Sequence, residues 1–366
     1  MKRNCFCAVA CLLLYSLFCA RPSGLASAAA PTKGEESRGA PAARLLSQES
    51  ASEHWELTAR FSSGHLLFVE FLVTNIGWGD RSAVAIGHVI APDGKTAPFR
   101  NGRREGRWQL SSDRLRLEVG GSTLDLHDPQ YRLIVDKKDV RADLRFRPDG
   151  PALWSDTLSK SGYSLDLLAA ATPVEGTIWT KGMPEPLAVQ GVLAATHSWM
   201  KNLASSLAVR RVEFFSLDET FPCYGIDLTT PSGANVRWFV LKRPEEKALE
   251  AVAPELVLER TLDGKKDPGY TLPGELRLTS VALNGRIRLE REVLRHDPLE
   301  HLPAPLRWLA ATTLNLHPRR VWAVSPFTMT LPPIPGTPTL VHSAPLIEHR
   351  GTGVTAVTFL NPLPSR

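Results

Sequence analysis

The segment 187–217, LAVQGVLAATHSWMKNLASSLAVRRVEFFSL, decides how the chain is divided. It begins as a strand in which apolar residues alternate with other residues, and it carries His197 and Trp199 near the end of that strand. A short helix-like stretch follows over 200–208, and a second strand rich in aromatic residues follows that stretch. Because the segment lies near the middle of a 366-residue chain, it predicts a junction between two domains.

Short alternating segments separated by Gly, Pro, Asn and Asp occupy both sides of this junction. They predict strands over 55–61, 66–76, 83–91, 115–119, 131–136, 140–147, 163–168, 176–180, 187–197, 209–217, 224–229, 235–242, 256–260, 275–282, 286–294, 320–324, 337–343 and 353–360. Asn284-Gly285 joins two of these runs and predicts a type I′ hairpin turn. Helices are expected only over 200–208 and 306–314.

Many short strands with few short helices favour antiparallel barrels or sandwiches. The fold class predicted is therefore all-β, with two lipocalin/calycin-like antiparallel β-barrels in tandem. The first barrel is expected over 53–200 and the second over 201–366. Barrels of this size hold a small ligand inside or at the mouth. A pair of β-sandwiches remains the alternative, because strand patterning alone does not separate the two architectures.

The first residues predict export. Lys2 and Arg3 precede an apolar run over 6–20, and Ala26-Ser27-Ala28 offers a cleavage site, so residues 1–28 are expected to be a signal peptide. The mature protein would then be periplasmic or extracellular, and a lipid-anchored form through Cys19 stays open. Residues 29–52 are rich in Ala, Pro, Gly, Ser and charge, and they predict a disordered leader.

Several classes of function are disfavoured. Three basic residues leave with the signal peptide, so the mature chain is nearly neutral and nucleic acid is not an expected partner. Phosphate-binding glycine motifs, GxSxG and HExxH are absent, which predicts no cofactor. His296, His301 and His317 favour a solvated loop over a metal site. Cys223 is the one cysteine left after cleavage. Membrane-surface contact and oligomeric state stay open.

Two stretches resemble a known family. The segment 71–77, FLVTNIG, followed by a strand and 91–95, APDGK, resembles the first barrel of the tandem lipocalin-like group. That group includes carotenoid 1,2-hydratase (hydroxyneurosporene synthase), fungal survival factors and decalin-forming pericyclases. The segment 191–199, GVLAATHSW, and the strand 210–216 are similar to its central region. The resemblance implies two barrels side by side and a hydrophobic or isoprenoid-like ligand, which some members bind and others transform.

Candidate catalytic residues are polar groups in otherwise apolar strands. His197 shares its strand face with apolar residues, and Glu70 shares a face with Phe68 and Leu72. A carboxylate in such a site is expected to have a raised pKa and to act as an acid. Glu213 is the third candidate. The candidate ligand-binding residues are Trp199, His88, Trp78 and Phe71. For each residue a purely structural role is the competing interpretation.

Three functions are compatible with these features. The main prediction is an exported binding protein for a hydrophobic small molecule, held in a barrel or between the barrels. The second is a hydratase- or cyclase-type enzyme that acts on a polyene or isoprenoid by proton transfer. The third is a structural β-protein of the envelope with filled barrels and no ligand. A cavity with Glu70 or His197 facing it would favour the first two.

Overall fold

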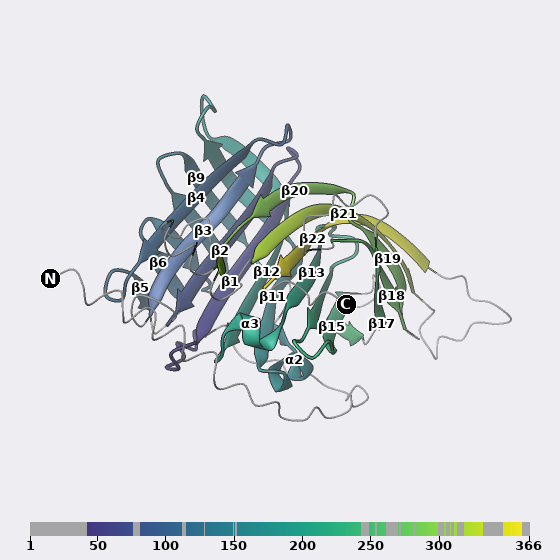
Figure 1. Ribbon diagram of the computed structural model, residues 1–366. Helices are drawn as coiled ribbons and strands as arrows, with labels where there is room; N and C mark the ends of the chain where they lie inside the picture. The colour runs from purple at the N-terminus through teal and green to yellow at the C-terminus, as the bar shows by residue number, and fades with distance from the viewer. Residues whose placement is uncertain are drawn as a thin grey trace.

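The computed structural model describes residues 42–75, 81–111, 115–127, 129–148, 150, 152–242, 249–252, 255–260, 270, 272–280, 283–298, 304, 308, 311–312, 318–331 and 347–360. The expected signal peptide, Trp78 and the predicted strand 337–343 lie outside these residues. The described chain forms two antiparallel sheets that curl into barrels one after the other (Figure 1). This is the all-β tandem-barrel architecture that the sequence predicted.

The first sheet contains twelve strands within the described residues. Their order is β4-β3-β2-β1-β12-β11-β9-β8-β7-β6-β5, and β10 pairs with β11. The bounds are β1 Ser52–Phe61, β2 Leu66–Thr74, β3 Ser82–Ile90, β4 Thr96–Arg103, β5 Gln109–Ser111, β6 Arg116–Val119, β7 Ser122–Asp125, β8 Tyr131–Asp136, β9 Val140–Phe146, β10 Leu153–Trp154, β11 Tyr163–Thr180 and β12 Leu187–Met200.

The second sheet contains ten strands in the part of the chain that is described. Their order is β16-β15-β14-β13-β22-β21-β19-β18-β17, and β20 pairs with β21. The bounds are β13 Arg210–Ser216, β14 Cys223–Thr229, β15 Asn235–Lys242, β16 Leu249–Val252, β17 Glu255–Arg260, β18 Pro273–Thr279, β19 Asn284–Arg288, β20 Arg291–His296, β21 Arg319–Leu331 and β22 Ile347–Phe359.

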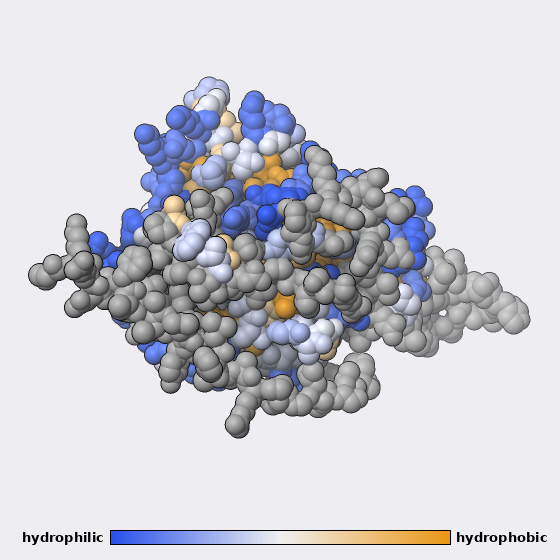
Figure 2. Space-filling view, in the orientation of Figure 1, coloured by the Kyte–Doolittle hydropathy of each residue, from blue (hydrophilic) through white to orange (hydrophobic). Residues whose placement is uncertain are grey.

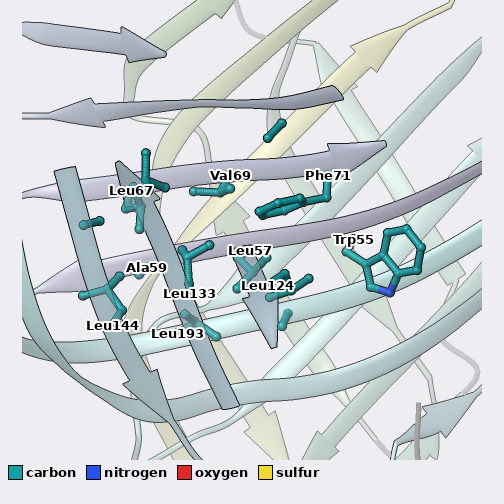
Figure 3. Packing of buried hydrophobic residues seen from close by; sticks show 14 of the residues in the cluster. Trp55, Leu57, Ala59, Leu67, Val69, Phe71, Leu124, Leu133, Leu144 and Leu193 are labelled. Atoms are coloured by element: carbon teal, nitrogen blue, oxygen red, sulfur yellow. The ribbon is translucent and has the colours of Figure 1, made fainter. Parts of the chain in front are cut away.

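The interior of the first barrel is filled by alternate residues of its strands. Trp55, Leu57 and Ala59 of β1 meet Leu67 and Val69 of β2 there, and side chains from β7, β8, β9 and β12 close the cluster (Figure 3). Because side chains alternate across a strand, the residues between them point outward. The barrel is thus a packed core, and a ligand of useful size must bind elsewhere.

The outward faces of the two barrels pack against each other. Leu66 and Phe68 of β2 share one buried cluster with Phe215, Ile226 and Trp322 of the second sheet. β1 and β12 are therefore buried on both faces, which explains their nearly continuous runs of buried residues. On the face shown in Figure 2, the described surface is mostly hydrophilic, with small hydrophobic areas between.

Helices are short. α2, Asp156–Lys160, was not predicted, and it begins where the hydroxyl of Ser155 accepts the backbone N–H of Leu158 at 3.2 Å. The helix predicted over 200–208 is reduced to α3, Ala204–Leu207, and 306–314 lies largely outside the described residues. Among the described helices, none has the length and apolar character needed to cross a membrane.

The hairpin predicted at Asn284-Gly285 is present, but its turn lies earlier in the chain. Thr279 of β18 faces Asn284 of β19, so Asn284 and Gly285 are strand residues. The backbone N–H of Ser280 donates to the carbonyl of Leu283 at 2.8 Å and closes the connection there. A Cβ at Gly285 would clash with the sulfur of Met329. Any larger residue at 285 would therefore force the Met329 side chain to move, and the prediction of a turn at this position was wrong.

Part of the expected leader 29–52 contacts the first barrel. The backbone N–H groups of Arg44 and Leu45 donate to the two carboxylate oxygens of Glu53, at 2.7 and 2.8 Å. Described residues 42–51 thus follow the end of the barrel, whereas the leader was expected to be disordered throughout. A short polar segment is held here because one buried carboxylate accepts two of its backbone donors.

Candidate active site between the two barrels

A cavity of about 310 Å³ lies between the outward faces of the two barrels. Its walls come from β1, β2, β3, β4, β11 and β12 of the first sheet, from α3, and from β13, β14, β20, β21 and β22 of the second sheet. Its apolar lining includes Phe68, Leu72, Val84, Ile86, Met200, Leu207, Leu228, Trp322 and Leu360. Its polar lining includes His54, Glu56, Glu70, His88, Arg100, Tyr163, Arg211, His296 and Arg320. An apolar pocket with a few convergent polar groups is typical of a small-molecule site.

The polar groups of the first barrel lie in register on neighbouring strands. Glu56 of β1 is paired with Glu70 of β2, Glu70 with Ile86 of β3, and Ile86 with Arg100 of β4. Two carboxylates placed directly opposite each other repel. The fold tolerates this arrangement because the second barrel supplies the compensating positive charge.

That charge comes from a matching row on the second barrel. Arg211 of β13 is paired with Thr358 of β22, Thr358 with Arg320 of β21, and Arg320 with His296 of β20. Strand pairing therefore places Arg211 and Arg320 on either side of Thr358, with His296 next to Arg320, on the face that meets the carboxylates of β1 and β2. The site is assembled only when both barrels are in place.

Glu56 is held by both arginines. Arg211 Nη2 lies 3.0 Å and Arg320 Nη1 lies 2.6 Å from Glu56 Oε1. Burial alone would raise the pKa of the Glu56 carboxyl, but these two guanidinium groups hold it well below its ordinary value. Glu56 is therefore an anion that joins the two barrels, and its lone pairs are committed to the arginines.

Glu213, one of the predicted catalytic residues, lies behind this network. Its side chain is fully buried, it accepts the hydroxyl of Tyr224 at 2.9 Å, and it lies 3.0 Å from Arg211 Nε. Burial raises its pKa, although Arg211 opposes the shift. Glu213 is not among the residues that line the cavity, so the structure places it as a buried partner of Arg211.

Glu70 faces the cavity, as its strand parity predicted, and pairs with His54. Glu70 Oε1 lies 2.7 Å from His54 Nδ1, and the two side chains retain 22% and 18% exposure. Arg320 Nη1 donates to Glu70 Oε2 at 3.2 Å. Burial would raise the pKa of Glu70, but the hydrogen bond from His54 and the charge of Arg320 lower it on balance. The expectation of a raised pKa was wrong, and Glu70 is an ionised carboxylate.

His54 is oriented on both sides of its ring. Nδ1 faces Glu70, and Nε2 lies 3.1 Å from the hydroxyl of Ser52. In the tautomer with a proton on Nδ1, His54 donates to the carboxylate of Glu70 and accepts the hydroxyl of Ser52. Imidazole and carboxylate groups are the side chains that general acid–base catalysis uses most often. The His54–Glu70 pair thus places an imidazole in contact with a carboxylate on the wall of the cavity.

His88, a predicted ligand-binding residue, lies on the wall of the cavity. Its ring meets the ring of His296 from the other barrel edge-on, with centroids 5.7 Å apart. Burial, followed by the charges of His296 and Arg320, lowers the pKa of His88 from 6.5 to about 4. His88 is therefore neutral at pH 7 and offers one N–H donor and one acceptor.

His197 lies on the interior side of the first barrel, away from the cavity. Its side chain is fully buried and stacks on Trp55 with centroids 4.8 Å apart. Nε2 lies 2.7 Å from Glu53 and Nδ1 lies 3.7 Å from Asp166. Burial would lower its pKa, but the two carboxylates raise it. The structure assigns His197 to a buried ion-pair cluster that closes the barrel end.

The remaining predicted ligand-binding residues do not line the cavity. Phe71 is fully buried in the core of the first barrel. Trp199 packs against His197 at 4.9 Å between centroids, and the guanidinium of Arg44 lies 4.8 Å from its ring. Trp78 lies outside the described residues. Of the predicted site residues, Glu70 and His88 are the ones that the structure brings to the cavity.

Sequence reasoning missed seven polar residues of the cavity lining: His54, Glu56, Arg100, Tyr163, Arg211, His296 and Arg320. One local signal was present. His54 and Glu56 alternate with Trp55 and Leu57, so β1 carries charge on one face and apolar residues on the other. Arg320 lies 250 positions from Glu70, and no local pattern predicts that contact. Among the described residues, no group of three or more His, Cys, Asp or Glu side chains could hold a metal ion.

Comparison with known proteins identifies the fold. No protein-family model matches the chain, and no curated protein matches it. The chain is similar to the crystal structure of a protein from Nitrosomonas europaea assigned as AttH, with a TM-score of 0.59 and 14% identity over 85% of this chain and 93% of that one. It is also similar to CghA, determined with Sch210972, with a TM-score of 0.59 and 15% identity over 86% of this chain and 89% of that one.

A third structural neighbour is kievitone hydratase from Nectria haematococca, with a TM-score of 0.52 and 11% identity over 88% of this chain and 94% of that one. At such identities, similarity establishes a shared architecture and leaves the activity to be argued from the site. The two curled antiparallel sheets, packed through their outward faces, give this chain the tandem lipocalin-like fold.

Proposed function

We propose that the protein is an enzyme that transfers a proton to or from a hydrophobic substrate held between its two barrels, in a hydration or cyclisation reaction. The contact of 2.7 Å between His54 Nδ1 and Glu70 Oε1 at the cavity wall carries this proposal. Charged groups lose hydration free energy when an apolar ligand covers them. A cavity that only stored an apolar ligand would gain nothing from this pair, whereas proton transfer requires a positioned acid–base group.

In a hydration, the proton held by the His54–Glu70 pair moves to one carbon of a C=C bond, and the oxygen of water bonds to the other carbon. The proton that this water loses returns to the pair, which ends the cycle unchanged. Arg320 keeps Glu70 ionised and in place. In a cyclisation, the His54–Glu70 pair donates the proton that starts ring closure. The pair regains a proton when the last carbon to react loses a proton.

The apolar wall supports a polyene or isoprenoid substrate. Ile86, Trp322 and Phe68 face the cavity, and such side chains stabilise a hydrocarbon by removing it from water. The family resemblance implies the same ligand class, and one neighbour of this fold is a hydratase by name. The packed interior of the first barrel makes that barrel an unsuitable store for the ligand.

An exported carrier for the same hydrophobic ligand is the competing function, and the apolar lining favours it equally. The two differ in one measurable respect, because a carrier returns its ligand unchanged. We would incubate the purified protein with the lipid extract of its own host in ¹⁸O-labelled water and analyse the products by mass spectrometry. The enzyme is expected to consume one lipid species, with ¹⁸O in the product if the reaction is a hydration.

Glu70→Gln removes the charge from the carboxylate and keeps its shape. It is expected to lower turnover by about 10²–10⁴-fold, which is the usual contribution of general acid–base catalysis. Glu175→Gln, at an exposed position of β11, is the matched control and should retain full turnover. Undiminished turnover in Glu70→Gln would reject the proposed role, and no consumption of any lipid by the wild type would leave the carrier as the function.

A further inference from the structure

We propose that Ser52, His54 and Glu70 act as nucleophile, base and orienting carboxylate in the hydrolysis of esters of hydrophobic acids. Ser52 Oγ lies 3.1 Å from His54 Nε2, and His54 Nδ1 lies 2.7 Å from Glu70 Oε1. Serine hydrolases place a hydroxyl at Nε2 of a histidine and a carboxylate at Nδ1, and this order of contacts recurs on unrelated folds. The activity goes beyond proton transfer to a substrate, because it gives Ser52 a covalent role.

Strand pairing builds this triad. Ser52 and His54 are two positions apart on β1, so both side chains leave the same face of the sheet. Thr74 and Leu72 of β2 lie directly opposite them, and Glu70 is the next residue on that face of β2. The imidazole of His54 therefore reaches Glu70 diagonally between neighbouring strands. The GxSxG motif does not identify such a triad, because that motif places its serine on a strand-to-helix turn.

Backbone contacts on both sides fix the position of the Ser52 hydroxyl. Ser52 is paired with Thr74 of β2 and with Met200 of β12. The carbonyl of the preceding residue, Ala51, accepts the backbone N–H of Asn75 at 3.0 Å. A functional group on a strand with neighbours on both sides is positioned more precisely than one on a loop. Ser52 and His54 are therefore held in contact before a substrate arrives.

The cavity gives an apolar ester a path to Ser52. His54 lines the cavity, and so does Met200, which lies directly opposite Ser52 on β12. Ser52 is the next residue after His54 on this face of β1, and it retains 7% exposure. The acyl chain of an ester can pack against Leu72 and Phe68, and its removal from water supplies affinity. The substrate class is therefore an ester with a hydrocarbon acyl chain.

The charge of Glu70 suits the role of the third member. Burial would raise the pKa of Glu70, but the hydrogen bond from His54 and the charge of Arg320 lower it on balance. When His54 accepts the proton of Ser52, the ionised carboxylate beside Nδ1 stabilises the imidazolium. It also holds the proton of the neutral ring on Nδ1, which leaves Nε2 free to act as the base.

The reaction has two steps. In the first, Ser52 Oγ bonds to the carbonyl carbon of the ester and its proton passes to His54 Nε2; the bond to the alcohol oxygen breaks, and the alcohol leaves with that proton. In the second, the oxygen of water bonds to the acyl carbon and one of its protons passes to His54 Nε2. The bond to Ser52 Oγ then breaks, and Oγ takes the proton. One acid and one alcohol result, and the enzyme is unchanged.

A fluorophosphonate with a decyl chain tests the nucleophile directly in the wild type. The Ser52 oxygen should bond to phosphorus and displace fluoride, and tandem mass spectrometry should place the label on Ser52, not on the exposed Ser47 of the same tryptic peptide. His54→Gln should abolish labelling. Ser63→Ala is the matched control and should be labelled as wild type is, because the exposed Ser63 also contacts a histidine, with its Oγ 3.0 Å from His65 Nδ1.

Hydrolysis of p-nitrophenyl octanoate measures the turnover of an ester. Ser52→Ala should lower kcat by about 10²-fold or more, whereas Ser63→Ala should retain the wild-type value. A folded wild type that is not labelled, or that is labelled at another residue, would overturn the triad. The triad would also be rejected by equal ester hydrolysis in the wild type and a folded Ser52→Ala protein.

Product masses separate this activity from the proposed function. Hydration adds the mass of one water to a lipid, and cyclisation leaves its mass unchanged, whereas ester hydrolysis divides the molecule into an acid and an alcohol. Labelling of Ser52 and ester hydrolysis, with no host lipid hydrated or cyclised, would retain the triad and reject the proposed function. A hydrated or cyclised host lipid with no label on Ser52 would reject the triad and retain the proposed function.

Discussion

Arg320 of the second barrel lies 2.6 Å from Glu56 of the first, and both side chains are almost entirely buried. The same guanidinium contacts Glu70 at 3.2 Å and lies 4.5 Å from the ring of its neighbour Trp322. One arginine therefore joins the barrels, contacts the carboxylate of the His54–Glu70 pair and contributes to the cavity wall. Its planar, permanently charged group suits a position with several partners better than lysine would.

Arg320→Gln should destabilise the protein by about 3–5 kcal/mol, since it leaves Glu56 and Glu70 with less compensating charge in a buried site. Urea unfolding followed by circular dichroism would measure the change. Arg132→Gln is the control, because Arg132 and Asp143 form an ion pair 2.6 Å apart at 43% and 39% exposure. Such a surface pair contributes about 0–1 kcal/mol. Similar losses in the two variants would contradict the assigned role of Arg320.

His197 is expected to stabilise the barrel without affecting ligand binding. His197→Gln leaves Glu53 and Asp166 without their shared cation, so a loss of about 3–5 kcal/mol is expected near pH 6. Because the folded-state pKa of His197 is raised above 6.5, its contribution is complete below pH 6.5 and disappears as pH rises through the folded value. Thermal unfolding at several pH values tests the trend. Lost ligand binding in a folded variant would instead restore His197 to the site.

His88 should give the opposite pH dependence. Its folded-state pKa is lowered from 6.5 to about 4, so the folded protein binds fewer protons than the unfolded chain and loses stability as pH falls between these values. The full shift corresponds to about 3 kcal/mol at most, and partial exposure reduces that figure. His88→Gln should lose less stability between pH 6.5 and pH 4 than the wild type does. His127→Gln, at an exposed position, should follow the wild type.

The sequence could predict which face a residue occupies, but it could not predict what covers that face. The alternation of apolar and polar residues correctly placed Glu70 on one strand face with Phe68 and Leu72. It also placed His197 on an apolar face, yet that face is the filled interior of a barrel. Both faces of β1 and β12 are buried, one by the first barrel and one by the second, so periodicity does not distinguish them.

The two arginines of the site could not be predicted from the sequence, for a related reason. Arg211 lies 155 positions from Glu56, and Arg320 lies 250 positions from Glu70. These contacts follow from strand pairing in two separate sheets and from the packing of one sheet on the other. In the sequence, each arginine stands beside a second arginine, Arg210 or Arg319, and strand parity determines which of the two faces the cavity.

Ile86→Trp tests whether the cavity is the site of binding and turnover. Ile86 lines the cavity from the outward face of β3, between Glu70 and Arg100 in the strand register. A tryptophan there would fill much of a space of about 310 Å³ while leaving every ionisable side chain in place. Turnover of the lipid substrate should fall by about tenfold or more. The melting temperature should stay within a few degrees of wild type, because the new ring occupies existing space.

Val140→Trp, directed into the packed core of the first barrel, is the contrasting variant, and it should lower stability through overpacking. Retained binding and turnover in a folded Ile86→Trp protein would move the site away from the inter-barrel cavity.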